Sequence, residues 1–385
     1  MTRYKRRKIA AAVKCMLILL APFAAAEAVK GVEFLISAAE KMNGISASSD
    51  AETDGTSTKY TLSRGNSTEE LLNGGIILSE GYGVEAETES EPRLQSPLDM
   101  VSDSPGEKPY PAEDQWVEGG DIVRTTYGKY SGNTFFDLDK CGQVNNKTEI
   151  SNEKLKEESR KIVDFTIENT TEPQVLIYHT HTTESFEPYV REHMDAEFNY
   201  RTTDDTKNMI MVGNAIQAEL EANGIGVIHV TEIHDYPSYN GSYGRSRESI
   251  VPILEQYPSI KVALDIHRDA ISGEGFAAQP YVEIDGKEAA QIMIISGCDD
   301  GTLDMPNYMM NFRFASKLQQ QLESDNEGLT RPILFDYRHY NQDLTTGSLL
   351  IEVGSHGNTL DQVQYSGQLI GRSLSTLLND MKEQK

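Results

Sequence analysis

From residue 173 to the C-terminus, short apolar runs alternate with stretches in which apolar residues recur at helical spacing. The apolar runs cover 175–180, 224–230, 260–267, 290–297 and 348–354. The helical patterns cover 206–223, 246–257, 307–324 and 359–381. Continuous apolar runs are typical of strands that are covered on both faces. The alternation therefore predicts an α/β domain over 173–385, with a mainly parallel twisted sheet flanked by helices.

The polar residues that follow the apolar runs are the first candidates for chemistry, because ligands of such sheets bind beyond the carboxyl ends of the strands. The first run leads into His179, His181 and Glu184. The third contains or leads into a second polar group, which comprises Asp265, His267, Arg268 and Asp269. The last run contains Glu352 and precedes His356. If these strands are neighbours, their ends converge on one site.

These residue types match a zinc site. Two neutral imidazoles and a carboxylate are a common zinc set, and a water in the fourth position acquires a pKa near 7. A further glutamate off the metal can take the proton of that water and pass it to a leaving nitrogen. Side chains alternate along a strand, so His179 and His181 have the same orientation on an ideal strand. Both can ligate, or one can support the other.

Other polar residues of this region have more than one interpretation. Glu352 lies inside an apolar run, where a carboxylate is costly unless it is paired or metal-bound. Asp265 can be functional or can orient a neighbour, and His356 suits a loop role. The polar loop 233–250 contains Tyr243 and Arg245, which could contact a sugar, peptide or carboxylate or could simply pack at the surface.

The first half of the chain has a different character. Residues 1–30 combine a basic start with the apolar stretch 9–26, and they predict a membrane-targeting segment, either a cleaved signal or an uncleaved anchor. Both alternatives put the rest of the chain on the extracytoplasmic face of the membrane. Residues 31–115 have the composition of a mostly disordered acidic spacer. Residues 116–172 predict a small lead-in subdomain, with a helix capped by Ser151 or Asn152.

Charge and cysteine content exclude two classes of function. The formal net charge of -25 leaves no basic surface for phosphates, which argues against nucleic-acid binding. The chain has three cysteines and no CxxC motif, which argues against a thiolate metal site or a disulfide framework.

Four segments of the second half, in this order, resemble the stage II sporulation protein P family. They are VLIYHTHTTESF (175–186), IHDYPSYNGSYGRS (233–246), KVALDIHRDA (261–270) and YNQDLTTGSLLIEVGSHGNTLDQ (340–362). The resemblance implies an amidase-like fold and a zinc-dependent cell-wall hydrolase of endospore-forming bacteria. Such enzymes cleave the amide between the muramic acid lactyl group and L-Ala of peptidoglycan, and also peptide cross-links. They act in the mother cell at the sporulation septum during engulfment, with stage II sporulation proteins D and M.

The resemblance also implies roles for particular residues. His181 and His267 become metal ligands, and Glu352 becomes the catalytic glutamate. The third ligand is assigned to Glu184, with Asp204 and Asp205 as alternatives because amidases place theirs just before the following helix. His179, Arg268, Arg245 and Tyr243 become supporting or substrate-binding residues.

Two other functions fit the same sequence. The chain can be a non-catalytic scaffold that binds the cell wall, or a zinc hydrolase that acts on another substrate. The absence of an HExxH motif disfavours the commonest class of zinc peptidase.

Overall fold

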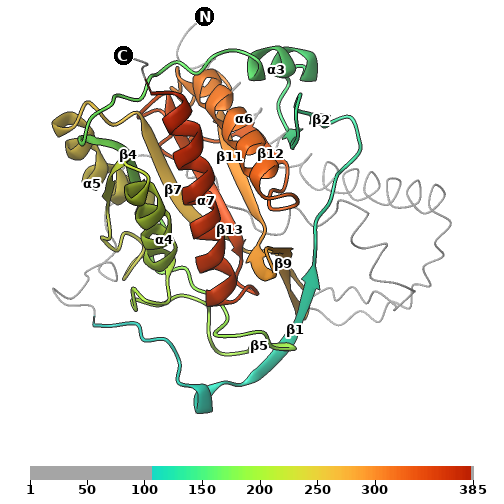
Figure 1. Cartoon of the computed structure of the whole chain (residues 1–385). Helices are drawn as coiled ribbons and strands as arrows, with labels where there is room; N and C mark the ends of the chain where they lie inside the picture. Colours follow the sequence, from blue (N-terminus) through green and yellow to red (C-terminus); the bar gives the residue numbers. More distant parts are fainter. Residues whose placement is uncertain (1–105, 383–385) are drawn as a thin grey trace, which may run out of the picture. The chain divides into compact units, whose positions relative to one another are not determined.

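The computed structural model describes residues 106–382, and its centre is a sheet of eight strands (Figure 1). In spatial order these strands are β2 (Phe135–Asp137), β3 (Gln143–Asn146), β12 (Ile333–Tyr337), β11 (Ile292–Cys298), β13 (Gly347–Ser355), β7 (Val262–Asp269), β4 (Pro173–Tyr178) and β6 (Gly226–His229). Only the β2–β3 and β11–β13 pairs are antiparallel. The predicted α/β class with a mainly parallel sheet is confirmed.

Helices cover both faces of this sheet. Three of them lie in front of it in Figure 1: α4 (Met209–Ala222), α6 (Tyr308–Asp325) and α7 (Leu360–Asp380). They pack on one large apolar core that includes Val175, Ile177 and Leu264. The alternate strand residues Leu176 and Tyr178 pack with α5 (Ser242–Gln256) in a separate cluster. Because side chains alternate along a strand, α5 lies on the opposite face.

A second, smaller sheet joins segments that are far apart in the sequence. Its strands are β10 (Lys287–Ala290), β9 (Phe276–Ile284), β1 (Glu118–Thr125) and β5 (His193–Asp195), with the short β8 (Ser272–Gly273) paired to β9. The β9–β10 hairpin turns through Asp285 and Gly286, both at positive φ, as its Asp-Gly sequence predicts. No pattern in the sequence predicted the pairing of β1 with β9.

The predicted lead-in segment 116–172 contributes to both sheets. Its strand β1 belongs to the smaller sheet, whereas β2 and β3 form the edge of the larger one. Its helix α3 (Asn152–Ser159) begins at the predicted cap, where Ser151 Oγ accepts a hydrogen bond from the Lys154 backbone N–H, and it packs against α6. Strands from this segment and from the predicted catalytic segment 173–385 therefore share the same sheets.

Capping residues define the helix starts that border the candidate site. Asn208 caps α4 by accepting a hydrogen bond from the Ile210 backbone N–H, and Thr359 caps α7 through the Gln362 backbone N–H. Helix α5 begins at Ser242 rather than at the predicted Ser246, and its interior contains Pro252.

The predicted targeting segment 1–30 and most of the predicted spacer 31–115 lie outside the described residues. Within 106–382, no helix combines the length and the apolar character that crossing a membrane requires.

Candidate active site

The carboxyl halves of three adjacent parallel strands bring the predicted residues together. Strand β7 lies between β13 and β4, and its residue His267 pairs with Glu352 of β13. Two residues earlier, Asp265 pairs with Tyr178 of β4. Since Ile266 belongs to the large core, the alternating side chains of Asp265 and His267 point to the face that carries α5.

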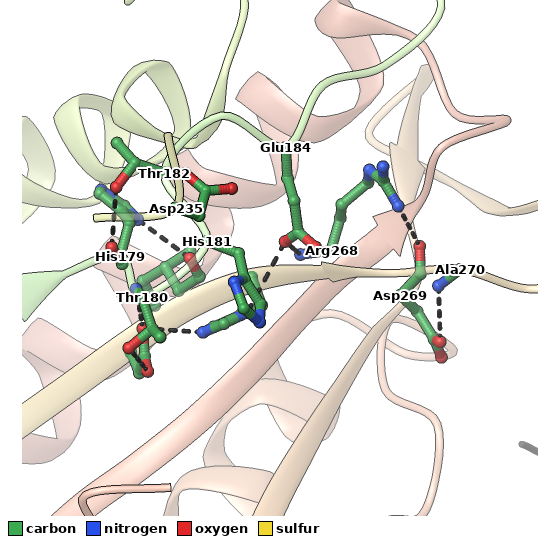
Figure 2. A network of polar contacts seen from close by, with 12 residues as sticks. His179, Thr180, His181, Thr182, Glu184, Asp235, Arg268, Asp269 and Ala270 are labelled. Atoms are coloured by element: carbon green, nitrogen blue, oxygen red, sulfur yellow. Dashed lines mark hydrogen bonds and ion pairs between the residues drawn. The ribbon is translucent and has the colours of Figure 1, made fainter. Parts of the chain in front are cut away.

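Two histidines, His181 and His267, and the carboxylate of Glu184 form the centre of this face. Figure 2 shows His181 and Glu184. The rings of His181 and His267 are nearly perpendicular, with centroids 5.0 Å apart. The Nδ1 atom of His267 lies 3.6 Å from Oε2 of Glu184. All three side chains are at most 8% exposed, so they face one another in a low-dielectric environment.

The carboxylate of Asp265 orients the His267 ring. Its Oδ1 lies 2.8 Å from His267 Nε2. The same carboxylate accepts hydrogen bonds from the backbone N–H (2.8 Å) and hydroxyl (2.7 Å) of Thr180. A carboxylate at Nε2 favours the proton there and leaves Nδ1, which faces Glu184, free to bind a metal.

The two site histidines differ in charge. Burial, and then the charge of His267, lower the pKa of His181 well below its usual value, so its imidazole is neutral at pH 7. Burial is the largest single effect and lowers the pKa of His267, but the carboxylates of Asp265, Glu184 and Glu352 together outweigh it and raise the pKa to about 9. A metal ligand must be neutral, so metal binding at His267 would release a proton.

Glu352 carries an unpartnered buried oxygen. Among the described residues, nothing forms a hydrogen bond to its Oε2. Burial, and then the charge of Asp269, raise its pKa to about 8. A carboxylate poised near neutral pH beside two histidines has the properties of a general base or acid.

Glu184 is held by two arginines. Its Oε1 lies 3.3 Å from Nη2 of Arg201, and its Oε2 accepts a hydrogen bond from the Arg268 backbone N–H at 3.1 Å. The Arg268 guanidinium donates instead to three backbone carbonyls, those of Ser185, Tyr200 and Asp269. Arg268 therefore braces the segment around Glu184, and its donors are occupied by the protein.

His179 and His181 diverge because β4 ends at Tyr178. The Nδ1–H of His179 donates to the Ile266 carbonyl at 2.9 Å, so its Nε2 accepts from His229 Nε2 at 2.8 Å. Both nitrogens of His179 are thus occupied on the α4 side of the sheet, close to Gly213. The common orientation expected from an ideal strand is wrong here, and His179 anchors the backbone next to His267.

Aromatic side chains from α5 and the loop before it surround the site histidines. Tyr239 stacks on His181 with ring centroids 4.4 Å apart, and its hydroxyl lies 3.0 Å from His181 Nε2. Tyr243 packs its ring edge-on to His181 and stacks parallel to His267. Arg245 donates to the backbone carbonyls of His234, Ser238 and Asn240, so it braces this loop.

The other predicted candidates lie apart from this centre. Asp204 accepts hydrogen bonds from Thr206 and forms an ion pair with Lys207, and Asp205 is exposed. His356 packs against the Tyr200 ring, and burial lowers its pKa to about 3. Of the three proposed third ligands, only Glu184 contacts His267.

The donor types fit a zinc ion, although the structure does not contain a closed metal site. Across residues 106–382, no group of three His, Cys, Asp or Glu side chains has an arrangement that could hold a metal ion. The hydroxyl of Tyr239 contacts His181, and the arginines contact Glu184. However, His181 is neutral, Nδ1 of His267 faces Glu184, and His267 has a carboxylate behind it, as zinc-ligating histidines commonly have.

Sequence reasoning missed two contributors. Arg201 lies in a segment without periodicity, yet it contacts both Glu184 and Asp235. Tyr239 stood among several tyrosines of one loop, and nothing in the sequence distinguished it. The sequence alone leaves the role of Asp265 open, although its place two residues before His267 puts both side chains on one face.

The fold and site define an α/β protein in which histidines and carboxylates from adjacent parallel strand ends form one buried polar centre. The sequence model of the family "Stage II sporulation protein P (SpoIIP)" matches residues 127–375. The chain belongs to this family. It is also 30% identical over 201 residues to stage II sporulation protein P of Bacillus subtilis (strain 168), which covers 49% of this chain and 47% of that protein. The chain thus spans about half the length of this curated relative.

Among solved structures, the chain is similar to two amidases at 12% identity and a TM-score of 0.33 each. One is N-acetylmuramoyl-L-alanine amidase AmiC2 of Nostoc punctiforme, with 54% of this chain and 96% of that chain covered. The other is the CwlD amidase from Clostridioides difficile, solved in complex with the GerS lipoprotein, with 54% and 99% covered.

Proposed function

We propose that this protein is a zinc-dependent peptidoglycan hydrolase that acts in sporulation. Membership of the stage II sporulation protein P family supports the biological setting. The observation that carries the chemistry is the unpartnered buried oxygen of Glu352, which lies on the strand position paired with His267. Burying an unpaired carboxylate costs free energy, so such a group is typical of a functional site, such as a reacting centre.

His181, His267 and Glu184 would hold the metal ion. Bound there, zinc would supply an activated water at neutral pH and polarise the carbonyl of the scissile amide. Asp265 favours the His267 proton on Nε2, so that Nδ1 would be free to bind the metal. Arg201 and the Arg268 backbone N–H keep the Glu184 carboxylate directed at His267.

Glu352 is the proton carrier of the proposed reaction. As a carboxylate it accepts a proton from the attacking water, and as a carboxylic acid it donates that proton to the leaving nitrogen. A pKa raised by burial suits both halves of this cycle near neutral pH. The aromatic wall formed by Tyr239 and Tyr243 limits the access of bulk water to the site histidines.

The substrate we propose is the amide between the muramic acid lactyl group and L-Ala, together with peptide cross-links. The setting proposed is the extracytoplasmic face of the mother-cell membrane at the sporulation septum. The N-terminal segment would provide the membrane attachment, and stage II sporulation proteins D and M would be partners.

The test uses the purified full chain and isolated peptidoglycan. With zinc, we expect released stem peptides whose new N-terminus is L-Ala; a chelator stops the release, and added zinc restores it. Glu352→Gln removes the activity, whereas Glu283→Gln, a glutamate exposed on β9, serves as the matched control. Products with a different new terminus would identify a zinc hydrolase of another bond. Binding of muropeptides without any cleavage would identify a scaffold.

A further inference from the structure

A long segment with little regular structure carries the proposed ligand Glu184. We call residues 183–203 the site loop. Apart from β5 it has no helix or strand. An antiparallel bridge between Glu184 and Arg201 joins its two ends, and we call these paired ends the neck. The Thr202 backbone N–H donates to the Thr183 carbonyl beside this bridge. Loops of this length without structure of their own are uncommon and usually functional, and they need external support to keep one conformation.

A segment at the N-terminal end of the described residues supplies such support. We call residues 108–117 the clamp. The Lys108 carbonyl accepts hydrogen bonds from the Thr203 backbone N–H and the Thr202 hydroxyl, at 2.8 and 2.7 Å. The Lys108 backbone N–H donates to the Thr203 hydroxyl at 2.8 Å. These bonds fasten the clamp immediately next to Arg201, the residue that contacts Glu184.

A second attachment lies on the other side of the neck, near Glu184. The Tyr110 hydroxyl donates to the Phe186 carbonyl at 2.7 Å, two residues beyond Glu184. The Tyr110 ring packs edge-on against Phe198 of the site loop, with ring centroids 5.1 Å apart. The clamp thus contacts both sides of the neck, one through Lys108 and the other through Tyr110.

Trp116 forms the third attachment. Its ring packs against Phe198 at 5.7 Å and Tyr200 at 6.5 Å, and the Arg191 guanidinium lies 3.8 Å above it. The next residue exchanges hydrogen bonds with the end of β5, because Val117 N–H donates to the Asp195 carboxylate and its carbonyl accepts from Ala196 N–H. Figure 1 shows the continuation of this contact, where β1 runs beside β5.

The first part of the clamp suits an extended strap, whereas Glu113–Gln115 form a short 3-10 helix, η2. Pro109 and Pro111 flank Tyr110, and proline fixes the backbone in conformations close to polyproline II. An extended segment that is stiff before it docks loses less entropy on docking. The clamp precedes the region 127–375 that matches the family, so the family match does not describe it.

We propose that the clamp is a positioning element for the site: docking of residues 108–117 keeps the site loop folded and the Glu184 carboxylate directed at His267. Tyr110 is the key positioning residue, because it joins the clamp to the backbone beside Glu184. The inference rests on the proposed function for the role of Glu184, but docking itself can be measured without any enzymatic turnover.

Trp116 provides the readout, because it is the only tryptophan of the chain. In the full-length protein, Tyr110→Ala should shift the Trp116 emission to longer wavelength and speed proteolytic cleavage within 183–203. We expect zinc affinity, measured by competition with a chelator, and stem-peptide release each to fall about 10–100-fold, the range typical for loss of support behind a metal ligand. Thr126→Val is the matched control, since Thr126 bonds the Tyr281 carbonyl at the far end of β1, and it should leave all four readouts unchanged.

The outcomes separate this inference from the proposed function. If Tyr110→Ala fails to fold by circular dichroism, Tyr110→Phe removes only the hydrogen bond to Phe186 and should show the same changes with smaller amplitude. A red shift of Trp116 with unchanged loop cleavage and unchanged zinc affinity would overturn the clamp, as would the absence of any change in both variants. If the wild type releases no product, the proposed function fails, while emission and loop cleavage still decide the clamp.

Discussion

Asp265 is the residue whose replacement best tests the design of the site. Its side chain is fully buried and has three contacts: the backbone N–H of Thr180, the Thr180 hydroxyl and Nε2 of His267. Asp265→Ala leaves the Thr180 N–H without an acceptor and the charged His267 without its ion-pair partner. Removing one partner of a buried charge pair costs about 3–5 kcal/mol, so we expect a loss near the middle of this range.

Asp265→Asn separates the charge from the hydrogen bonds. The amide oxygen can still accept from Thr180 and face His267. The amide NH2 then points at the Thr180 hydroxyl, which can donate to Ser246 instead because that bond runs in either direction. At pH 10, where His267 is neutral in both proteins, we expect this variant to lose only about 1 kcal/mol from the weaker neutral hydrogen bonds.

The two proteins should respond differently to pH. Burial lowers the pKa of His267, but Asp265, with smaller contributions from Glu184 and Glu352, raises it to about 9, above the unfolded value of about 6.5. A raised pKa contributes stability that is fully present below pH 6.5 and is lost as pH rises through 9, which amounts to about 3 kcal/mol. Asp265 is the largest of the effects that raise this pKa, ahead of Glu184 and Glu352, so most of the contribution disappears without its charge. The stability difference between wild type and Asp265→Asn should therefore shrink by about 3 kcal/mol or somewhat less from pH 6 to pH 10.

The assay is urea unfolding of the metal-free full chain in chelator at several pH values. Subtracting the two stability curves removes the groups that titrate equally in both proteins. Parallel curves would refute the assignment of Asp265 as the partner that charges His267. Zinc affinity of Asp265→Asn should in addition fall about 10–100-fold, as expected when the carboxylate behind a histidine ligand loses its charge.

Three further predictions address the proton carrier and the packing behind the site. Glu352→Gln should lower stem-peptide release about 10²–10⁴-fold while zinc affinity is retained, because an amide cannot carry the proton; substantial residual activity would assign that role to another group. Asp269→Asn should move the acidic limb of kcat/KM to lower pH, since burial and then the charge of Asp269 raise the pKa of Glu352; an unmoved limb would contradict this coupling. Gly213→Ala should destabilise the fold by about 1–3 kcal/mol, because its Cβ would collide with His229 and lie 2.7 Å from Nε2 of His179, which are bonded to each other; equal or higher stability in unfolding experiments would show that this histidine pair can move.

Local sequence patterns predicted most of the helices and core strands. Helical periodicity located α4, α6 and α7 to within a few residues. The continuous apolar runs located five of the eight strands of the large sheet but missed β2, β3 and β12. These predictions succeed because burial of one helix face, or of both strand faces, requires a pattern that is visible in a short window. The Asp-Gly turn of the β9–β10 hairpin is equally local, since positive φ favours these residues.

The candidate site was accessible to sequence reasoning only in part. The grouping of His181, His267 and Glu352 followed from polar residues at the ends of apolar runs, since parallel strands bring those ends to one edge. Their roles stay predictions until metal binding and turnover are measured. The choice of Glu184 over Asp204 and Asp205 needed the path of the site loop, which no local pattern determines.

The sequence by itself therefore determined the helices, the core strands and the kinds of side chain available at their ends, because these depend on residues close together in the chain. The tertiary structure decided what each side chain does there. It occupied the donors of Arg245 and Arg268 with backbone carbonyls, it turned His179 away from His181 where β4 ends, and it placed the clamp against the neck of the site loop. The Arg245 bonds stay within one loop, whereas the other outcomes depend on contacts between segments far apart in the sequence, such as that between Tyr110 and Phe186, and only packing of the whole domain selects them.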